Sequence, residues 1–434
     1  MDNEFGYLDD KPFEECYKDK QIMSLINTDE KGIEFKVIGN NKFSIFDIRK
    51  SLKEIYAIDS KFCPITAFRV NIINSKLTAI SSSTLRSDLY FYKQGFQEEN
   101  RKIKHFTSQT KIYKIEYYND SISRVFGNSS FDIDLKRVQK NDKYVLKTVN
   151  IKADKKKEQK ICNIKIVDNN ISVFLKENFE YLHNYRNSER ISINDNSCII
   201  VKFQKGINFD KAYKYILLLD SLFYLMTLLK RRHKKVFVYD FRKNKYLCRD
   251  MKMEEVGNEV RDRNFLICKR QESVDTFDKM FKTLYILEKD SKNALFPFWE
   301  FDIKQTSLEI KFLEYYKILE YLDYEKRKKL GKGKNKTFLK EFLNENKDLK
   351  ERFFGTQDIT EIEEEIRALR NYYSHEGYYV HKLPIPTDKP RRYKNIEPDW
   401  LYNVLNFIKI ASYMEIYKFC GLKIDWKNLV YNIW

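Results

Sequence analysis

The chain has 434 residues, enough for two to three domains, because a typical domain has about 150 residues. Hydrophobic residues make up 42% of it and aromatic residues 15%, which excludes a disordered chain, since such chains have little apolar surface to bury. The formal net charge of +18 favours a polyanionic partner, either a nucleic acid or a membrane surface, and the 12 Gly and 7 Pro are too few for a fibrous or linker-rich protein.

The first part of the chain has the pattern of β-hairpins. Short alternating apolar stretches are separated by Asn, Gly, Asp and Ser in EFKVI-GNN-KFSIF (34–46), FRVNII-NS-KLTAI (68–80) and NIKIV-DNN-ISVFL (163–175). A further pair, VFVYDF-RKN-KYLC, follows at 236–248. These patterns predict a β-rich region over 1–295, which could form two lobes, 1–160 and 161–295.

The N-terminus and the cysteines bear on the compartment. The segment MDNEFGYLDDKPFEE is acidic and has no apolar run, so it is not typical of a signal peptide. The 7 cysteines are scattered and include no Cys-x-x-Cys pair, which argues against a zinc cluster and a thioredoxin-like motif. We therefore expect reduced thiols in a cytoplasmic protein.

One apolar stretch, YKYILLLDSLFYLMTLL (213–229), is nearly long enough to span a membrane. Lys214 and Asp220 would then lie in the bilayer, and a central Asp costs about 3 kcal/mol on insertion scales. The sequence therefore favours a buried helix in a protein that does not cross a membrane.

Helical periodicity dominates after Phe296 and Pro297, over residues 307–322, 337–349, 360–373 and 399–419. Four helices in this length of chain predict an antiparallel four-helix bundle. The predicted fold is thus α+β, with the β-rich region at 1–295 followed by an all-α bundle at 296–434.

The third predicted helix ends in a distinctive segment, EIRALRNYYSHEGYY (365–379). Thr360 followed by Glu363 predicts a capping box at its start, and Gly377 is suited to end it. A stripe at helical spacing is predicted to face the core: Ile362, Ile366, Leu369 and Tyr373.

Arg370, Asn371 and His375 occupy the last turns of this helix and are the candidate catalytic residues. A helix C-terminus stabilises a protonated imidazole, which suits His375 to proton donation. The guanidinium of Arg370 can bind phosphate oxygens and offset charge that develops in a transition state, and Asn371 can orient either group. RNA carries its own nucleophile, the 2′-hydroxyl, so these groups could cleave it without a metal ion, and we expect no cofactor.

The spacing of Arg370 and His375 favours a dimer. Five residues along an ideal helix correspond to a rotation of about 140°, so the two side chains of one copy point apart unless the helix unwinds. Two copies of the helix around a two-fold axis would create a shared site with two Arg and two His.

RNYYSH (370–375) resembles the Arg-polar-x3-His signature of HEPN ribonucleases, which lies at the end of the third helix of a four-helix bundle. The segment EIKFLEYYKILEYL (309–322) resembles the first HEPN helix, with Glu320 as its acidic residue. Upstream, the β-rich region and the apolar helix are similar in order to the N-terminal part of ApeA-like HEPN proteins. The resemblance implies a metal-independent endoribonuclease that dimerises through its HEPN domain and acts as a toxin in anti-phage abortive infection. It also implies tRNA or other cellular RNA as substrate, and an N-terminal region that restrains the nuclease until a phage-derived trigger binds.

Two basic segments flank the catalytic helix in sequence. KRKKLGKGKNK (326–336), with Lys332 and Lys334, predicts either a phosphate-binding loop or a solvated charged loop. KPRRYK (389–394), with Arg391 and Arg392, follows the helix and is nearer to the candidate site in sequence. Tyr372 and Tyr378 could stack on unpaired bases.

Other interpretations stay open. Arg370 could form an ion pair with Glu363 or Glu314 on the bundle surface while His375 only caps the helix, or the fold could be HEPN without activity. A CRISPR ancillary HEPN nuclease would begin with a Rossmann-like nucleotide-binding domain, for which the hairpins and the lack of a Gly-rich strand–helix turn give no support. A non-catalytic RNA-binding protein and a membrane-associated protein are the remaining alternatives.

Overall fold

The computed structural model describes a set of separate ranges: 2–9, 22–29, 32–37, 54–59, 64–72, 78–87, 106–107, 109–126, 131–140, 143–153, 158–165, 169–177, 179–183, 191–195, 197–228, 235–250, 268, 270–290, 307–331, 338–375 and 398–433. In parts of these ranges, including most positions before 106, only the backbone is described. Together they form a mixed α+β protein with antiparallel strands.

The chain divides into two compact units. Unit 1 comprises Met1–Phe223, Arg231–Arg261 and Lys269–Asp278, and unit 2 comprises Tyr224–Lys230, Asp262–Cys268 and Lys279–Trp434. The division passes through helices α3 (Phe209–Thr227) and α4 (Ser273–Asp290), so each helix contributes residues to both units. The boundary predicted at residue 296 lies outside the described residues.

Unit 1 contains the strands. They are β1 (Asp2–Asp9), β2 (Ile22–Asp29), β3 (Gly32–Val37), β4 (Glu54–Asp59), β5 (Pro64–Ile72), β6 (Thr78–Ser87), β7 (Ile112–Tyr118), β8 (Phe131–Lys140), β9 (Lys143–Ala153), β10 (Glu158–Lys165), β11 (Asn170–Lys176), β12 (Phe179–His183), β13 (Ile191–Asp195), β14 (Cys198–Ile207), β15 (Lys235–Asp240) and β16 (Lys245–Asp250). The main sheet has the order β10-β11-β14-β7-β15-β16-β6-β3-β2-β1-β4-β5, and β8–β9 and β12–β13 form two separate ribbons.

Three of the predicted hairpins are confirmed, since β5–β6, β10–β11 and β15–β16 pair as antiparallel neighbours. In the fourth, β3 pairs with β2 and β6, and residues 42–46 lie outside the described residues. Strand β7 lies between β14 and β15, so strands from before and after residue 160 share the sheet.

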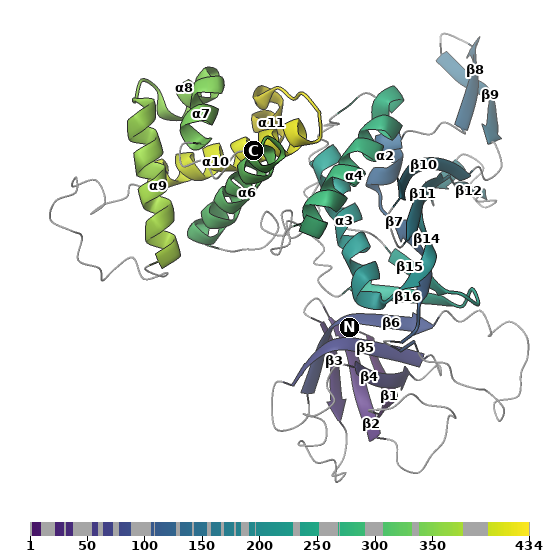
Figure 1. Ribbon diagram of the computed structural model, residues 1–434. Coiled ribbons are helices and arrows are strands. Elements are labelled where there is room, and N and C mark those ends of the chain that lie inside the picture. Colours follow the sequence, from purple (N-terminus) through teal and green to yellow (C-terminus); the bar gives the residue numbers. More distant parts are fainter. Residues whose placement is uncertain are drawn as a thin grey trace, which may run out of the picture. The chain divides into compact units, whose positions relative to one another are not determined.

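Helix α3 lies against β7, β14 and β15, and the core of unit 1 forms between them (Figure 1). Tyr117 of β7 stacks on Phe223 of α3 with ring centroids 5.8 Å apart. Asp220, only 2% exposed, accepts a hydrogen bond of 2.7 Å from the Tyr117 hydroxyl, which in turn accepts one of 2.9 Å from Asn119. The Asp within the apolar stretch is therefore tolerated because its burial is offset by a hydrogen bond. Two short elements, α2 (Ser121–Phe126) and the 3-10 helix η3 (Arg270–Glu272), contact each other nearby.

Among the described helices, none combines the length and the apolarity needed to cross a membrane. Of the described cysteines, Cys162, Cys198, Cys248, Cys268 and Cys420 are free thiols, and all but Cys268 are buried.

Unit 2 is helical. Its helices are α6 (Leu308–Lys329), α7 (Phe338–Glu345), α8 (Lys347–Phe354), α9 (Ile359–His375), α10 (Pro398–Phe419) and α11 (Trp426–Ile433). Helix α6 packs on α9 and α10, α7 on α8 and α9, and α10 also on α8 and α11 (Figure 1). The end of α3 belongs to this core, because the hydroxyls of Tyr224 and Tyr413 lie 2.6 Å apart and the Tyr417 hydroxyl donates to the Leu225 carbonyl at 2.6 Å.

The four predicted helices are present with three differences. The second is broken at Asn346, whose backbone (φ −123°, ψ 56°) is not helical and whose side-chain amide donates to the Phe342 carbonyl at 2.8 Å. Helix α6 extends to Lys329, so the first four basic residues of the predicted loop at 326–336 are helical. Helix α11 was not predicted.

The predicted capping box of α9 is wrong. The helix begins one residue earlier, and Asp358 caps it by accepting a hydrogen bond of 2.7 Å from the Thr360 amide. This bond, together with one from the Glu361 amide, lowers the pKa of the Asp358 carboxyl. Thr360 instead accepts a hydrogen bond from Lys340 at 3.1 Å, and Glu363 pairs with Arg367.

Candidate functional site

Helix α9 positions the predicted catalytic segment through its buried face. The predicted stripe is confirmed, since its four side chains are at most 5% exposed: Ile362, Ile366, Leu369 and Tyr373. Burial of each aliphatic side chain contributes about 1.5–3 kcal/mol. Tyr373 also meets Phe312 of α6 edge-on, with ring centroids 6.0 Å apart. This packing leaves Arg370 and Asn371 at the edge and on the surface of the helix, respectively.

Arg370 is held by two contacts, one from each of two helices. Its guanidinium Nη2 lies 3.4 Å from Oε2 of Glu320 on α6, and its Nη1 donates to Oδ1 of the exposed Asn371 at 3.2 Å. The side chains of Arg370 and Glu320 are 30% and 39% exposed, so solvent reaches both groups. A guanidinium has five N–H donors, and these two contacts leave donors for a further ligand.

A buried phenol lies close to this ion pair. Tyr316 of α6 is 3% exposed. Burial raises the pKa of Tyr316 to about 12; the Glu320 carboxylate adds to the rise, whereas Arg370 and Arg367 oppose it. At neutral pH the phenol therefore keeps its proton and can act only as a neutral hydrogen-bonding group.

The two ion pairs that the sequence left open for Arg370, with Glu363 or with Glu314, do not form. Glu363, 5% exposed, pairs with Arg367 one turn along α9, and Glu314 pairs with Lys317 at 2.8 Å. Arg370 pairs instead with a carboxylate further along α6 than Glu314. The partner, Glu320, is the acidic residue that the sequence singled out on the first helix of this unit, although not as a partner of Arg370.

His375 is the last residue of α9, and its side chain lies outside the described part of the structure. The backbone is helical without interruption from Arg370 to His375. The two positions are therefore separated by about 140° around the helix axis.

All six predicted RNA-binding side chains also lie outside the described part of the structure: Lys332, Lys334, Arg391, Arg392, Tyr372 and Tyr378. The described part of the first basic segment has internal partners, because Arg327 pairs with Glu341 at 3.0 Å and with Asp323 at 3.4 Å. Its guanidinium is therefore occupied by carboxylates.

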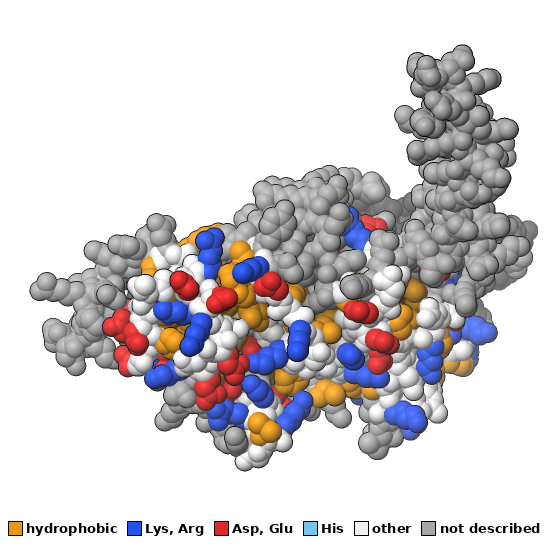
Figure 2. Space-filling view, turned by 90° about the horizontal axis from the view of Figure 1, so that it is seen from above, with side chains coloured by type: hydrophobic (Ala, Val, Ile, Leu, Met, Phe, Trp, Pro, Cys, Tyr) orange, Lys and Arg blue, Asp and Glu red, His pale blue; other side chains and the backbone are white. Residues whose placement is uncertain are grey.

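The surface drawn in Figure 2 shows basic and acidic side chains interspersed over the described residues. The described part of this surface is therefore neither uniformly basic nor uniformly acidic. Among the described residues, no group of three or more His, Cys, Asp or Glu side chains is arranged to hold a metal ion.

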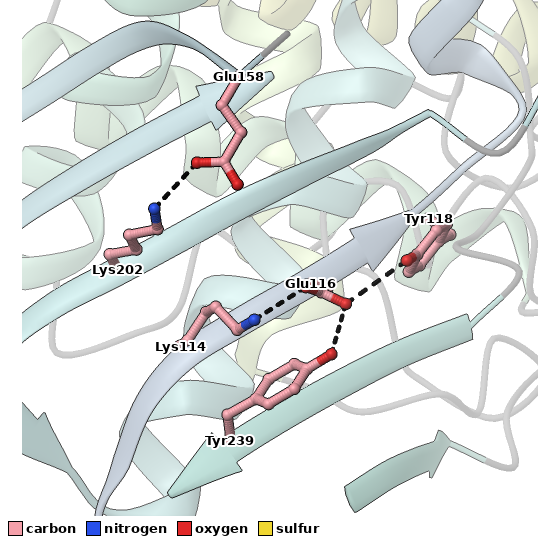
Figure 3. A network of polar contacts seen from close by, with 6 residues as sticks. All are labelled: Lys114, Glu116, Tyr118, Glu158, Lys202 and Tyr239. Carbon is pink, nitrogen blue, oxygen red and sulfur yellow. Dashed lines mark hydrogen bonds and ion pairs between the residues drawn. The ribbon is translucent and has the colours of Figure 1, made fainter. Parts of the chain in front are cut away.

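A second polar cluster lies in unit 1, around Glu116 of β7 (Figure 3). The Glu116 carboxylate accepts hydrogen bonds from Lys114 at 2.9 Å, from the Tyr239 hydroxyl at 2.6 Å and from the Tyr118 hydroxyl at 3.5 Å. Burial acts to raise the pKa of Glu116, but the bonds from Tyr239 and Lys114 and the charge of Lys114 outweigh it, so the pKa is lowered.

The other groups of this cluster keep their protons. Burial raises the pKa of both Tyr118 and Tyr239, and the Glu116 carboxylate adds to the rise. The neighbouring Cys198 thiol has its pKa raised to about 12 by burial and by Glu116, so it is not a reactive thiolate at neutral pH. The cluster thus holds one anion between neutral donors and a lysine.

Sequence reasoning missed this cluster, although a signal for it exists. Both KIEYY (114–118) and KVFVY (235–239) place charged or aromatic residues at alternate positions, which a strand brings to one face. The second segment was interpreted only as part of a hairpin.

Comparisons with protein-family models, curated proteins and solved structures give no match to this chain.

Proposed function

We propose that the chain is a metal-independent endoribonuclease of the HEPN type, with the cleavage site at the C-terminal end of α9. One observation carries the proposal. Arg370, a partly exposed guanidinium held by Glu320 and Asn371, lies in an uninterrupted helix that ends at His375. These residue types and their spacing match the Arg-polar-x3-His signature.

In the proposed reaction, the RNA 2′-hydroxyl attacks the adjacent phosphorus and the P–O5′ bond breaks. His375 moves protons between the attacking and leaving oxygens, and Arg370 offsets the negative charge on the phosphorus-bound oxygens. Asn371 keeps the guanidinium oriented through its 3.2 Å contact. The products are a 2′,3′-cyclic phosphate and a 5′-hydroxyl, and DNA, which lacks the 2′-hydroxyl, is resistant.

A homodimer supports this chemistry. Since the helix continues through residue 375, positions 370 and 375 of one copy lie on different sides of α9, about 140° apart. A two-fold arrangement of α9 brings Arg370 of one copy toward His375 of the other. A C2 dimer is also the commonest symmetric assembly.

We further propose that the enzyme is a cytoplasmic toxin of anti-phage abortive infection, with cellular RNA, including tRNA, as substrate. The strand-rich N-terminal region then restrains the nuclease until a phage-derived trigger binds. This role comes from the HEPN and ApeA-like resemblance and from the order of the regions.

The CRISPR ancillary alternative calls for a parallel, Rossmann-like sheet in the N-terminal region. Each strand pairing among the described residues is antiparallel, which disfavours this alternative. Cleavage stimulated by cyclic oligoadenylate would reinstate it.

A non-catalytic RNA-binding protein is the second candidate. The ion pair of Arg370 with Glu320 favours it, because a guanidinium that serves only to join α6 to α9 needs no substrate. Such a protein would bind RNA in a salt-sensitive way and leave it intact.

The decisive experiment incubates the purified chain with total RNA in EDTA and maps the cut ends. Arg370→Ala and His375→Ala should each lower cleavage about 100-fold or more, because they remove charge stabilisation and proton transfer, respectively. Both variants should retain folding and dimerisation, as judged by circular dichroism and light scattering.

Arg352→Ala is the matched control, since it removes an exposed guanidinium from α8 and should leave cleavage unchanged. Cleavage that persists in both site variants would refute the assignment. Binding of intact RNA with no cleavage by the unmodified chain would support the second candidate instead.

A further inference from the structure

The sheet of unit 1 presents a row of basic and aromatic side chains on the face opposite to α3. Residues directly opposite each other on paired strands lie on the same face. One such row crosses β14, β7, β15 and β16 as Lys202, Lys114, Tyr239 and Lys245. The other face of the sheet packs against α3, since Tyr117 of β7 contacts Asp220 and Phe223 of that helix.

The neighbouring rows continue the pattern. In the next row, Phe174 of β11 lies opposite Ile200 of β14, and Ile200 lies opposite Glu116 of β7. Glu116 in turn lies opposite Phe237 of β15. On the far side of that row, Tyr118 lies opposite Lys235. Three of the aromatic side chains on this face, Phe174, Tyr118 and Tyr239, are partly exposed, whereas Phe237 is buried. Each of the four rings is next to a strand that carries a lysine.

Contacts between these lysines and rings are close. The Nζ atom of Lys114 lies 3.5 Å from the ring centroid of Tyr239, and that of Lys202 lies 4.3 Å from the centroid of Phe174. Lys245 lies 3.7 Å from the Phe237 centroid. Lys235 lies 4.7 Å from the Tyr118 centroid and 5.7 Å from that of Phe237.

Charge on this face is mainly positive. Among the described side chains that the register of β7, β10, β11, β14, β15 and β16 places on it, the basic ones are Lys114, Lys160, Lys165, Lys176, Lys202, Lys235 and Lys245. The acidic ones are Glu116 and Glu158, which pair with Lys114 and Lys202, respectively (Figure 3). Lysines therefore outnumber carboxylates among these side chains, and this excess of positive charge complements a polyanion.

We infer that this face of the sheet, the lysine–aromatic face, binds single-stranded RNA. The partly exposed rings of Phe174, Tyr118 and Tyr239 can stack on unpaired bases, and the lysines can pair with the phosphates between them. A double helix keeps its bases stacked inside, so it offers only phosphates and should bind more weakly. The inference does not depend on the nuclease, since the face lies in unit 1 and would bind RNA whether or not α9 cuts it.

The network around Glu116 adds order to this surface. By accepting hydrogen bonds from both Tyr118 and Tyr239, the carboxylate holds two rings on neighbouring strands. A base that stacks on a ring displaces the lysine above it, and the freed ammonium then lies next to the phosphate of the same strand. Ring and cation therefore both keep a partner in the complex.

The test uses the full chain with His375→Ala in every sample, so that the probe stays intact. The probe is fluorescein-labelled oligouridylate, and its binding is followed by anisotropy over a range of salt concentrations. Lys202→Ala combined with Lys235→Ala should weaken binding and reduce the slope of log K against log salt by about 1.4, since each lost phosphate contact contributes about 0.7. The matched control, Lys211→Ala combined with Lys214→Ala, removes two exposed lysines from α3 and should change neither quantity.

Stacking is tested separately at Phe174. Phe174→Leu keeps an apolar side chain but removes the ring, and should weaken binding about tenfold, whereas Phe174→Tyr keeps the ring and should bind like the parent. Thermal unfolding of each variant shows whether the fold is retained.

Three results would overturn the inference: unchanged affinity and salt slope in the lysine variant, equal binding by Phe174→Leu and Phe174→Tyr, or equal affinity for a double-stranded probe. Binding to phosphatidylserine vesicles through the same lysines, with oligouridylate binding unchanged, would assign the face to a membrane instead and would also overturn it. Cleavage by the chain with His375 intact is scored separately, so failure here is distinguishable from failure of the proposed nuclease.

Discussion

At the scale of single residues, Glu116 is the buried carboxylate whose protonation state has the clearest consequence for stability. Its side chain is 9% exposed and its lone pairs are satisfied by a lysine and two tyrosines. Since the pKa in the folded chain lies below the ordinary value of 4.5, ionised Glu116 stabilises the fold at neutral pH. That contribution is fully present above the unfolded-state pKa and is lost as the pH falls through the folded-state value.

Glu116→Gln should therefore lower the free energy of unfolding by about 1–3 kcal/mol at pH 7, because the donors around it lose a charged acceptor. The difference between the variant and the parent should shrink as the pH falls below 4.5, the ordinary pKa of the group. Urea unfolding at pH 7, 5 and 3.5 measures both effects. Glu158→Gln, at an exposed ion pair, is the control and should change stability by less than about 1 kcal/mol. A difference in the free energy of unfolding between Glu116→Gln and the parent that is the same at every pH would contradict a stabilising role of the ionised carboxylate.

At the scale of elements, the contact between α6 and α9 determines where the Arg370 guanidinium lies. The pair with Glu320 is about one-third exposed on each side, so it contributes little to stability but can still orient the guanidinium. We propose that Glu320 is a positioning residue for Arg370.

Glu320→Ala should lower kcat for RNA cleavage about tenfold with little change in KM, because a misplaced charge stabilises the transition state less well. Glu320→Gln, which keeps a hydrogen-bond acceptor, should restore part of the loss. The control is Glu314→Ala, which breaks the pair with Lys317 on the same helix and should leave kcat unchanged. An unchanged kcat in Glu320→Ala, with stability also unchanged, would exclude the positioning role.

At the scale of the whole molecule, the proposed active site needs two copies of the chain. A mixture of Arg370→Ala and His375→Ala chains, unfolded and refolded together, should regain part of the cleavage activity that each lacks alone. The reason is that a mixed dimer has one site with an intact Arg from one copy and an intact His from the other. Activity is measured in EDTA, and light scattering gives the mass of the mixed species.

A mixture that stays inactive while forming dimers would show that Arg370 and His375 act within one copy. Each variant refolded alone is the control, since it contains no complementary copy.

Much of the fold could be predicted from sequence because it depends on neighbours along the chain. The stripe of α9 follows from helical periodicity, and the hairpins β10–β11 and β15–β16 follow from alternation and turn residues. Local signals were less reliable at element ends. Asp358 rather than Thr360 caps α9, and Asn346 breaks a predicted helix, because short polar side chains can bond the backbone in several competing ways.

The periodicity of the sequence was enough to place Arg370, Asn371 and His375 at the end of one helix, because helical structure depends on neighbours along the chain. The partners of these residues depend on how the helices pack. The sequence left Glu363 and Glu314 open as partners of Arg370, whereas the ion pair forms with Glu320, which is 50 residues away in the chain. Tertiary packing likewise brings Tyr117 to Asp220, 103 residues away in the chain. It also aligns Lys202, Lys114 and Tyr239 across three strands. Such contacts arise when distant segments are packed to bury their apolar faces, and no local pattern along the chain specifies which segments will meet.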